Sequence, residues 1–377
     1  MFRTYKLKNL NYKLILGIVA LNIIGILVIG SANYEYQSKQ MLGMILGVFV
    51  MGVVALIDYD FVLQFSKLYY IGVVGLLIMV LLFGDNSGGA TRWIDLGIRF
   101  QPSELGKILL ILFFANYFMQ YEDEINEKRF IIKTAIIAAI PLALILKEPD
   151  LSTTIVTFLI IASLMFVTGI SYKLVGIVLA ISIPTVVGGI LLILAKGASL
   201  LKDYQGMRIL AWLKPEEYPG AAFQQQNSIM AIGSGQFFGK GLYNNSVDSV
   251  KNGNYIPEPQ TDFIFAVAGE EMGFIGAVAI VLLLLFITYQ CFRTAKSAKD
   301  LSGKLICTGM GALVGFQSFV NICVVTGLMP NTGLPLPFVS YGLTSLVTLY
   351  FGMGFVLNVG LQGKNLKRGG ILSLISD

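Results

Sequence analysis

The stretch ILGIVALNIIGILVIGSA, residues 15–32, carries no charged side chain and is as long as a helix that crosses a lipid bilayer. No A-x-A-like cleavage site with a polar region behind it follows, so we expect a retained span rather than a signal peptide. The whole chain of 377 residues shares this character, with 55% hydrophobic and 13% charged residues. Soluble domains carry roughly 25% charged residues, so the sequence predicts an integral membrane protein.

Further apolar segments of similar length predict an all-α fold class with about ten transmembrane helices. After residues 15–32, they cover about residues 40–59, 68–84, 106–121, 131–147, 152–170, 172–195, 264–292, 305–328 and 344–361. We expect one polytopic membrane domain over residues 1–377, with a long extracytoplasmic loop at about 196–261, before the eighth span.

Basic residues near the helix ends predict the orientation, because cytoplasmic loops are enriched in Lys and Arg. With an even number of spans, both termini and the loops near residues 128–133 and 293–304 share one side, which we expect to be the cytoplasm of a bacterium. The other side of the cell membrane then receives residues 85–104, 196–261 and 327–342. Function is expected in these Gly- and Pro-containing loops.

Composition excludes several classes of chemistry. The chain has no histidine, which removes Ser-His-Asp triads and His-ligated zinc. Its three cysteines lie in or beside apolar runs without a CxxC motif, so neither a disulfide framework nor a metal site is indicated. The net charge of +5 is spread over loops and chain ends, which argues against nucleic-acid binding.

Asp262, Glu270 and Glu271 interrupt the apolar part of the stretch PEPQTDFIFAVAGEE, residues 257–271. Asp262 is expected at the start of the eighth span, where a helix cap by Thr261 or Asp262 is the simple interpretation. An ionisable group at the membrane face of an outer loop is also a candidate functional residue. A helix N-terminus would lower its pKa, which suits a general base or a metal ligand. Glu270 and Glu271 are expected to turn inward and pair with a buried Lys or Arg.

Two polar stretches precede membrane spans. In RWIDLGIRFQPSELGK, residues 92–107, Glu104 and Lys107 are expected to pair at helical spacing, while Arg92 or Lys107 is a candidate to bind an anionic head group. In KEPDLSTT, residues 147–154, Asp150 or Ser152 is a candidate helix cap. These charges neutralise one another or line the same polar cavity as Asp262.

Three further stretches fall in the outer loops. YQGMRILAWLKPEE, residues 204–217, predicts a short amphipathic segment along the membrane surface. In QQQNSIMAIGSGQFFGKG, residues 224–241, glycines and serines around Lys240 either cradle phosphate or form plain turns. NTGLPLPFVSYG, residues 331–342, cannot form a regular helix, so we expect a re-entrant Pro/Gly segment before the tenth span.

Together these stretches resemble the SEDS family (shape, elongation, division and sporulation), membrane glycosyltransferases that polymerise peptidoglycan from lipid II. The resemblance covers essentially the whole chain. It is carried by GATRWIDLG, QPSELGK, EPDLSTT, QNSIMAIGSG with GKG, PEPQTDFIFAVAGEE with MGFIG, and TGLPLPFVSYG. The YQGMRI stretch with its KP turn, and IDY after the second span, are more similar to the RodA (elongation) branch than to the FtsW (division) branch.

The resemblance implies a role for particular residues. Asp262 matches the family's essential aspartate and is the predicted catalytic residue. The predicted substrate-binding residues are Arg92, Glu104, Lys107, Arg208, Lys240 and Ser340. Two positions depart from the family pattern, since Gln236 stands where a glycine is usual and Leu343 replaces the second glycine of SYGG.

The resemblance also implies partners. They are lipid II, a class B penicillin-binding protein that cross-links the product, and the elongation or division machinery. A divalent cation, Mg²⁺ or Mn²⁺, with Asp262 as a ligand is compatible with the chemistry, and no organic cofactor is expected.

Three other functions stay open. A lipid II flippase or transporter fits many spans around a polar cavity, although the polar groups gather at one face rather than at the midplane. A scaffold that positions another synthase would not need Asp262. The third is a division or sporulation paralogue of the same family.

Overall fold

The computed structural model describes residues 5–87, 90–95, 99–196, 204–244, 249, 251–253 and 255–363. The predicted all-α class is confirmed. The helices are α1 (Tyr12–Ala32), α2 (Tyr34–Ala55), α3 (Tyr59–Leu63), α4 (Ser66–Phe83), α5 (Pro102–Gln120), α6 (Lys128–Lys147), α7 (Leu151–Val167), α8 (Tyr172–Lys196), α9 (Tyr204–Leu213), α10 (Pro219–Ser234), α11 (Ile264–Lys296), α12 (Leu301–Val325) and α13 (Leu343–Gln362).

A small antiparallel sheet in the order β1-β2-β3 lies between α4 and α5 in the sequence. Its strands are β1 (Asp85–Ser87), β2 (Ala90–Asp95) and β3 (Arg99–Phe100). The sequence did not predict these strands. Short 3-10 helices cover Leu7–Asn9 and Glu122–Glu124.

Each predicted membrane span coincides with a helix. Among the described residues, eight helices are long and apolar enough to cross a membrane, and α7 is a shorter apolar helix of 17 residues. The helix α5 carries the buried charges of Glu104 and Lys107, which lowers its hydropathy. The multi-pass prediction is therefore supported, while the count of ten spans stays a prediction.

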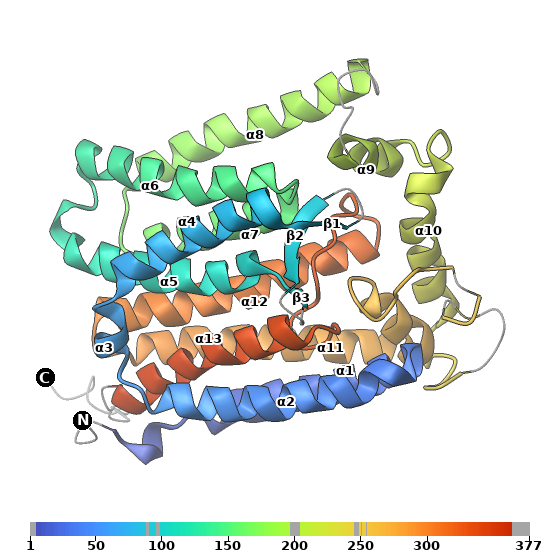
Figure 1. Ribbon diagram of the computed structural model, residues 1–377, viewed down its shortest axis with the longest axis horizontal. Helices are drawn as coiled ribbons and strands as arrows, with labels where there is room; N and C mark the ends of the chain where they lie inside the picture. Colours follow the sequence, from blue (N-terminus) through green and yellow to red (C-terminus); the bar gives the residue numbers. More distant parts are fainter. Residues whose placement is uncertain are drawn as a thin grey trace, which may run out of the picture.

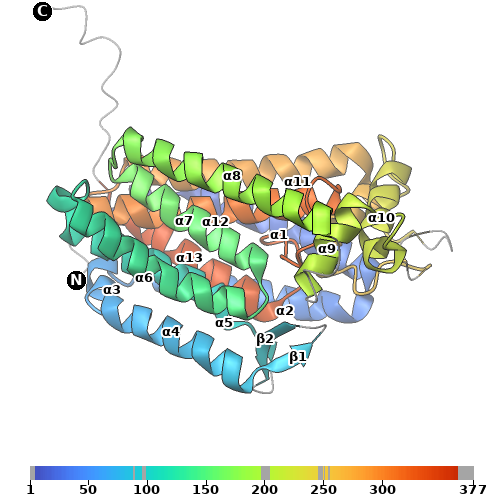
Figure 2. The same ribbon diagram turned by 90° about the horizontal axis from the view of Figure 1, so that it is seen from above.

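The long helices lie side by side, and α12 forms the centre of the bundle (Figure 1). It packs against α5, α7, α11 and α13, and 78% of its most apolar window is buried. The helix α8 lies along one edge of the bundle in Figure 1, and this side faces the viewer in Figure 2. None of its described residues is buried, which is typical of an apolar helix that faces lipid.

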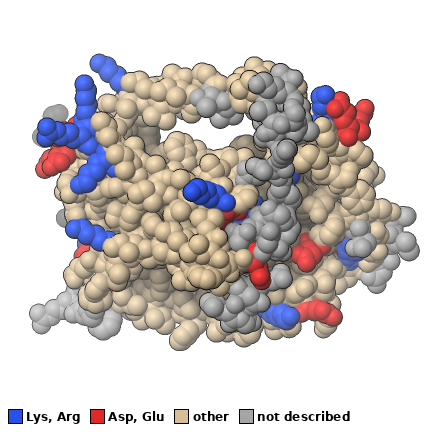
Figure 3. Space-filling model, turned by 45° about the horizontal axis from the view of Figure 1, so that its top comes forward, with Lys and Arg blue, Asp and Glu red and all other residues tan. Residues whose placement is uncertain are grey.

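The two ends of the described chain meet at one end of the bundle, because the Lys6 backbone N–H donates to the Leu361 carbonyl at 3.0 Å. The helices α9 and α10 and the small sheet lie toward the other end (Figure 1). Lys and Arg side chains gather at the end with the termini, and the surface between the two ends is largely uncharged (Figure 3). This distribution fits a bundle that spans a membrane.

The predicted loop around residues 224–241 is partly wrong, because α10 takes up its first half through Ser234. The rest packs on a break in α11, where Gly273 has a φ of 63°. Around the break, Lys240 N–H donates to the Glu270 carbonyl at 2.9 Å, and Phe274 N–H donates to the Gln236 carbonyl at 2.9 Å. The segment thus satisfies backbone groups that the broken helix leaves unpaired.

The glycines of this contact are needed for close approach. A Cβ atom on Gly273 would lie 2.3 Å from the Gly239 nitrogen, and one on Gly235 would lie 2.0 Å from the Gly269 carbonyl oxygen. Close backbone packing therefore explains Gly235 and Gly239 of GSGQFFGKG without a bound phosphate, whereas a Cβ atom on Gly233 or Gly241 would meet no other atom within 4 Å.

Candidate active site

Asp262 lies in the loop that leads into α11, and it does not cap that helix. The N-cap residue is Phe263, which makes no side-chain cap bond, and the Thr261 hydroxyl instead donates to the Glu258 carbonyl at 2.8 Å. The predicted cap by Thr261 or Asp262 is therefore wrong. The partly buried carboxylate of Asp262 is left available for other contacts.

Three side chains from distant segments converge at Gly333, in the segment between α12 and α13. A Cβ atom on Gly333 would lie 3.3 Å from Asp262 Oδ2, 3.7 Å from Arg208 Nη1 and 3.7 Å from Arg92 Nη1. Gly333 has a φ of 75°, a backbone conformation that glycine adopts without strain. The sequence selected these three side chains separately, and the fold brings them together around one residue.

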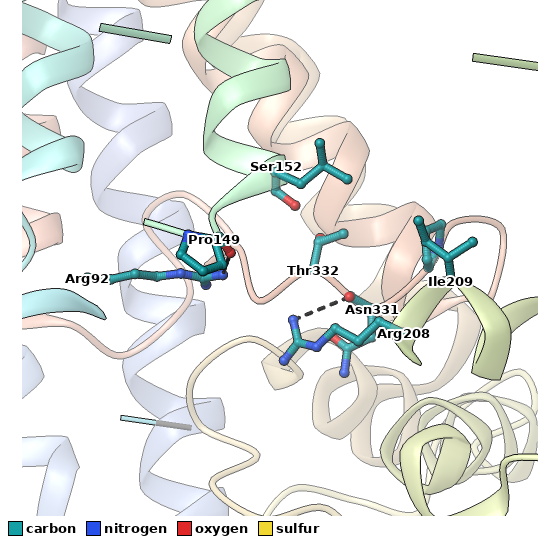
Figure 4. A pocket seen from close by; sticks show the side chains of 9 residues that line it. Arg92, Pro149, Ser152, Arg208, Ile209, Asn331 and Thr332 are labelled. Atoms are coloured by element: carbon teal, nitrogen blue, oxygen red, sulfur yellow. Dashed lines mark hydrogen bonds between the residues drawn. The ribbon is translucent and has the colours of Figure 1, made fainter. Parts of the chain in front are cut away.

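Arg92 comes from β2 and Arg208 from α9, and both line a pocket between these elements and the segment after α12 (Figure 4). Arg208 Nη1 donates to the Asn331 carbonyl at 3.3 Å. Arg92 donates to the Pro149 carbonyl. The pocket is lined by Arg92, Pro149, Leu151, Ser152, Arg208, Ile209, Pro330, Asn331 and Thr332.

Asp150 is both a helix cap and a member of this polar cluster, so the two interpretations of KEPDLSTT are compatible. Its Oδ1 accepts from the Thr153 backbone N–H at 3.1 Å, which caps α7. Its Oδ2 lies 3.7 Å from Arg92 Nε and accepts from Gln101 Nε2 at 3.4 Å. Asp150 thereby holds Arg92 in place beside the pocket.

Burial raises the pKa of Asp262 from 3.8 to about 6, although Arg208 and Arg92 lower it in part. The sequence predicted a lowered pKa, so the predicted direction was wrong. Removal from water outweighs the nearby positive charges. A carboxylate with a pKa of about 6 is still mostly ionised at pH 7, and it is a stronger base than an ordinary aspartate.

Glu148 has its pKa raised to about 8, mainly by burial and also by Asp150, against a lowering by Arg92. It is therefore mostly protonated at neutral pH. Glu148 therefore contributes little negative charge beside Asp150 and Arg92.

The predicted pair of Glu104 and Lys107 is confirmed, and it is buried inside the bundle. Lys107 Nζ lies 2.7 Å from Glu104 Oε1 and donates to Gln317 Oε1 at 2.6 Å. Gln317 Nε2 in turn donates to the Pro335 carbonyl at 3.0 Å. The pair therefore supports the segment that carries Gly333 and does not line the pocket in Figure 4.

Ser340 and Asn321 fasten that segment to the loop of Asp262. Ser340 Oγ accepts from the Leu336 backbone N–H at 2.7 Å and donates to the Thr261 carbonyl at 2.7 Å. Asn321 Nδ2 donates to the carbonyls of Asp262 at 2.8 Å and Leu334 at 2.6 Å. Asn321 was not among the residues predicted from the sequence, although a polar residue within an apolar span was a usable signal. As predicted, residues 331–342 form no regular helix.

Lys240 lies apart from the pocket of Figure 4. Its Nζ is 2.7 Å from Glu270 Oε1, and Lys251 Nζ is 2.7 Å from Glu271 Oε1. The expectation that both glutamates pair inside the protein is confirmed. Neither partner was identified from the sequence, because both lie in the segment between α10 and α11.

The donor set does not fit a divalent cation held by the protein alone. The described residues contain no group of three or more Asp, Glu, Cys or His side chains that would hold a metal ion. The two guanidinium groups that converge with Asp262 near Gly333 oppose a further positive charge there. The expected cation stays a prediction, and no step below is routed through it.

Comparison with known proteins identifies the family. The sequence profile described as Cell cycle protein, which joins FtsW, RodA and SpoVE, matches residues 9–365. The chain belongs to this family. The resemblance to SEDS proteins is thus confirmed over nearly the full length.

Relatives and solved structures agree with this assignment. A probable peptidoglycan glycosyltransferase FtsW of Escherichia coli O6:H1 is 34% identical over 83% of this chain and 74% of its own length. The protein of the same name from Geobacter sulfurreducens strain PCA is 33% identical over 93% of this chain and 95% of its own. These names support the predicted enzyme class, a peptidoglycan glycosyltransferase.

Two solved structures share the fold. A chain of a peptidoglycan synthase complex that coordinates polymerization and crosslinking matches with a TM-score of 0.77 at 28% identity, over 93% of this chain and 97% of that chain. The rod shape determining protein RodA of Thermus thermophilus matches with a TM-score of 0.66 at 25% identity, over 93% and 96%. The predicted RodA branch is not resolved, because the curated relatives named above are FtsW proteins.

Proposed function

We propose that this peptidoglycan glycosyltransferase polymerises lipid II at the outer face of the cell membrane, with Asp262 as the base. The observation that supports this most is the convergence of Asp262, Arg208 and Arg92 at Gly333. A carboxylate and two guanidinium groups around one point are suited to a reaction that removes a proton and releases an anion.

In the proposed reaction, a sugar hydroxyl attacks the anomeric carbon of a lipid-linked disaccharide. A new C–O glycosidic bond forms while the bond from the anomeric carbon to the phosphate oxygen breaks. The electron pair leaves with polyprenyl pyrophosphate, and the hydroxyl proton passes to Asp262. Arg208 and Arg92 stabilise the charge that develops on the leaving group.

The other predicted substrate-binding residues take different places in this proposal. Glu104, Lys107 and Ser340 position the segment around Gly333 through buried contacts. Lys240 belongs to a separate cavity, beside Glu270. The reacting groups are therefore assigned to Asp262 and the two arginines.

The test is lipid II polymerisation by the purified protein in detergent, with and without a class B penicillin-binding protein. Asp262→Asn keeps the shape of the side chain but removes the base, so the rate should fall by at least about 100-fold. Asp60→Asn is the matched control, because Asp60 is an exposed carboxylate of α3 that pairs with Lys299. Near-normal polymerisation by Asp262→Asn would reject the proposed base.

A flippase is the second candidate, because eight of the described helices are long and apolar enough to cross a membrane and a polar pocket lies toward one end of their bundle. It predicts that the native protein moves lipid II across vesicle membranes and forms no glycan under any partner condition. In that outcome the glycosyltransferase mechanism is wrong and Asp262 serves translocation.

Two cellular roles are candidates for this enzyme, cell elongation and cell division. The YQGMRI stretch, with the KP turn that follows it, favours elongation, and the FtsW names of the curated relatives favour division. Expression in bacteria depleted of either their RodA or their FtsW would decide between them. Rescue of cell width and rod shape supports elongation, whereas rescue of septum formation supports division.

We also propose that a class B penicillin-binding protein is the partner and that both termini are cytoplasmic. The synthase complex among the structural matches and the basic residues at the end with the termini support these two points. Cysteine labelling of intact cells at either terminus tests the orientation. Co-purification of a transpeptidase with the native chain tests the partner.

A further inference from the structure

A second cavity lies between α10 and α11, apart from the pocket that contains the two arginines. Its volume is about 310 Å³, at the lower end of the size range of small-molecule sites. It is lined by Asn227, Met230, Ala231, Ser234, Lys240, Tyr255 and Glu270, none of which lines the pocket of Figure 4.

The helix α10 connects the two cavities. Gln224 Oε1 accepts from Asn331 Nδ2 at 3.2 Å, and Asn331 lines the arginine pocket. Asn227, three residues later on the same helix, lines the second cavity. Gln224 and Asn227 are about 4.5 Å apart along the helix axis, so the same stretch of α10 contacts the lining of one cavity and forms part of the lining of the other.

The polar groups of the second cavity are held in place by other parts of the protein. Asn227 is 6% exposed, and its Nδ2 donates to the Tyr255 carbonyl at 2.8 Å, which fixes the amide plane. Lys240 is bound through its ammonium to Glu270 at 2.7 Å and through its backbone N–H to the Glu270 carbonyl at 2.9 Å. Such fixed groups bind a ligand with little further loss of conformational entropy.

The lining combines a few fixed polar groups with a larger apolar surface, which suits a neutral ligand that carries both polar and apolar groups. The ammonium of Lys240 is already neutralised by Glu270, so a charged ligand would have to disrupt a short ion pair. Amide, ammonium and carboxylate groups bind hydroxyl and amide groups of a sugar, while the Tyr255 ring and Met230 offer apolar contact. An N-acetylated sugar presents both kinds of surface.

We propose that the cavity between α10 and α11 is a saccharide subsite that holds N-acetylated sugar residues of the glycan next to the reacting site. This inference rests on the proposed function and adds a second place where the carbohydrate is bound. The subsite keeps one sugar segment close to Asp262 between successive additions, so it should affect the affinity for glycan and the strand length.

The experiment measures binding of lipid-free N-acetylchitotetraose to the purified full chain by saturation-transfer NMR, together with the length of the strands made from lipid II. Met230→Trp fills the cavity without removing the ion pair, and it should weaken binding of the probe by about tenfold or more and shorten the strands. Phe223→Trp is the matched control, because Phe223 is exposed on α10 two turns earlier and does not line the cavity. It should behave as the native chain.

Asp262→Asn separates this inference from the proposed function. It should bind the probe with native affinity and make no strands. If the native chain fails to bind the probe at millimolar concentration, or if Met230→Trp binds it equally well, the saccharide subsite is rejected. If Asp262→Asn polymerises normally, the proposed mechanism fails while the binding result still stands on its own.

Discussion

At the scale of single residues, the site depends on the absence of a side chain at Gly333. The residue lies where a Cβ atom would approach one carboxylate oxygen and two guanidinium nitrogens within 3.3 to 3.7 Å. The neighbouring Asp262 is ionised despite its partial burial because two arginines offset part of the cost. The position and the ionisation of the Asp262 carboxylate therefore depend on a few neighbouring atoms.

The activity should depend on pH through Asp262. Since its pKa is raised to about 6, the ionised base is lost as the pH falls, and the rate should drop by about tenfold per pH unit below this value. Above about pH 7 this group should no longer limit the rate. Initial rates of lipid II polymerisation from pH 5 to 8 test this, and a rate independent of pH from 5 to 7 contradicts it.

The raised pKa of Asp262 also affects folding stability, which should fall as the pH rises, whereas the activity should increase. The folded pKa of about 6 lies above the ordinary value of 3.8, so the folded state binds the proton more tightly than the unfolded state. Stability is therefore lost as the pH rises through this window. Asp262→Asn should flatten this dependence and raise thermal stability at pH 7, by an amount on the order of 1 kcal/mol. A lower melting temperature of Asp262→Asn would contradict the dominant effect of burial.

Gly333→Ala should abolish most activity. The added methyl group lies 3.3 Å from Asp262 Oδ2 at a backbone φ of 75°, so it crowds the site and strains the chain by roughly 1–2 kcal/mol. Gly327→Ala is the matched control, with a similar φ of 79° but contact only with the flexible end of Ile229. Equal polymerisation rates for the two variants would show that strain, and not access to Asp262, limits the reaction.

At the scale of elements, two irregular segments decide where the functional groups lie. The segment between α12 and α13 carries Gly333 and is fastened by Asn321, Gln317 and Ser340. The break in α11 at Gly273 is filled by the start of the segment after α10, which brings Lys240 against Glu270. In both places regular helix geometry gives way to specific backbone contacts.

Gln236→Gly should stabilise the contact between this segment and α11. Gln236 has a φ of 47°, which costs a non-glycine residue roughly 1–2 kcal/mol. Glycine removes this strain, although its greater conformational freedom in the unfolded chain offsets part of the gain. The expected net gain in unfolding free energy is about 0.5 kcal/mol. The melting temperature in detergent measures it, with Gln236→Ala as control because alanine loses the side chain but keeps the strain. An equal rise in both variants would contradict the strain argument.

Leu343, the other departure from the family pattern, causes no backbone strain. Leu343 is the first residue of α13 and adopts helical geometry, so it needs no glycine. Its side chain packs toward Gly43 of α2, at 3.1 Å from the position of a Cβ atom on that glycine. Leu343 therefore contributes to the contact between α2 and α13.

At the scale of the whole molecule, buried charges connect the bundle to the site. Lys107 joins Glu104 of its own helix to Gln317 of α12, which reaches the segment of Gly333. Lys107→Met alone leaves Glu104 as an uncompensated buried charge and should cost about 3 kcal/mol of stability. The double variant with Glu104→Leu should recover most of this loss, as measured by thermal unfolding.

The activity of that double variant decides the role of the pair. If it is stable and retains polymerisation, Glu104 and Lys107 act through the packing of the bundle. A stable but inactive double variant would show that the contact of Lys107 with Gln317 is needed to position the segment of Gly333, since neither residue of the pair lines the pocket.

The local features of this protein were predictable because they depend on short stretches of sequence. Long apolar runs predicted the helices, since a bilayer requires internally hydrogen-bonded spans. The spacing of Glu104 and Lys107 predicted their pairing, and the prolines of residues 331–342 predicted a non-helical segment. The resemblance selected Asp262 and Arg92, and the positive charge of Arg208 in an outer loop made that residue a candidate, but neither observation could show that the three side chains meet.

By itself, the sequence determined that this is a helical membrane protein of the SEDS family and which residues are candidates for its chemistry. Only the tertiary structure decided that Asp262, Arg92 and Arg208 converge at Gly333, that Lys240 belongs to a second cavity, and that the pKa of Asp262 is raised. The physical reason is that these properties depend on contacts between segments up to hundreds of residues apart and on removal from water. Neither is encoded in a local pattern of residues.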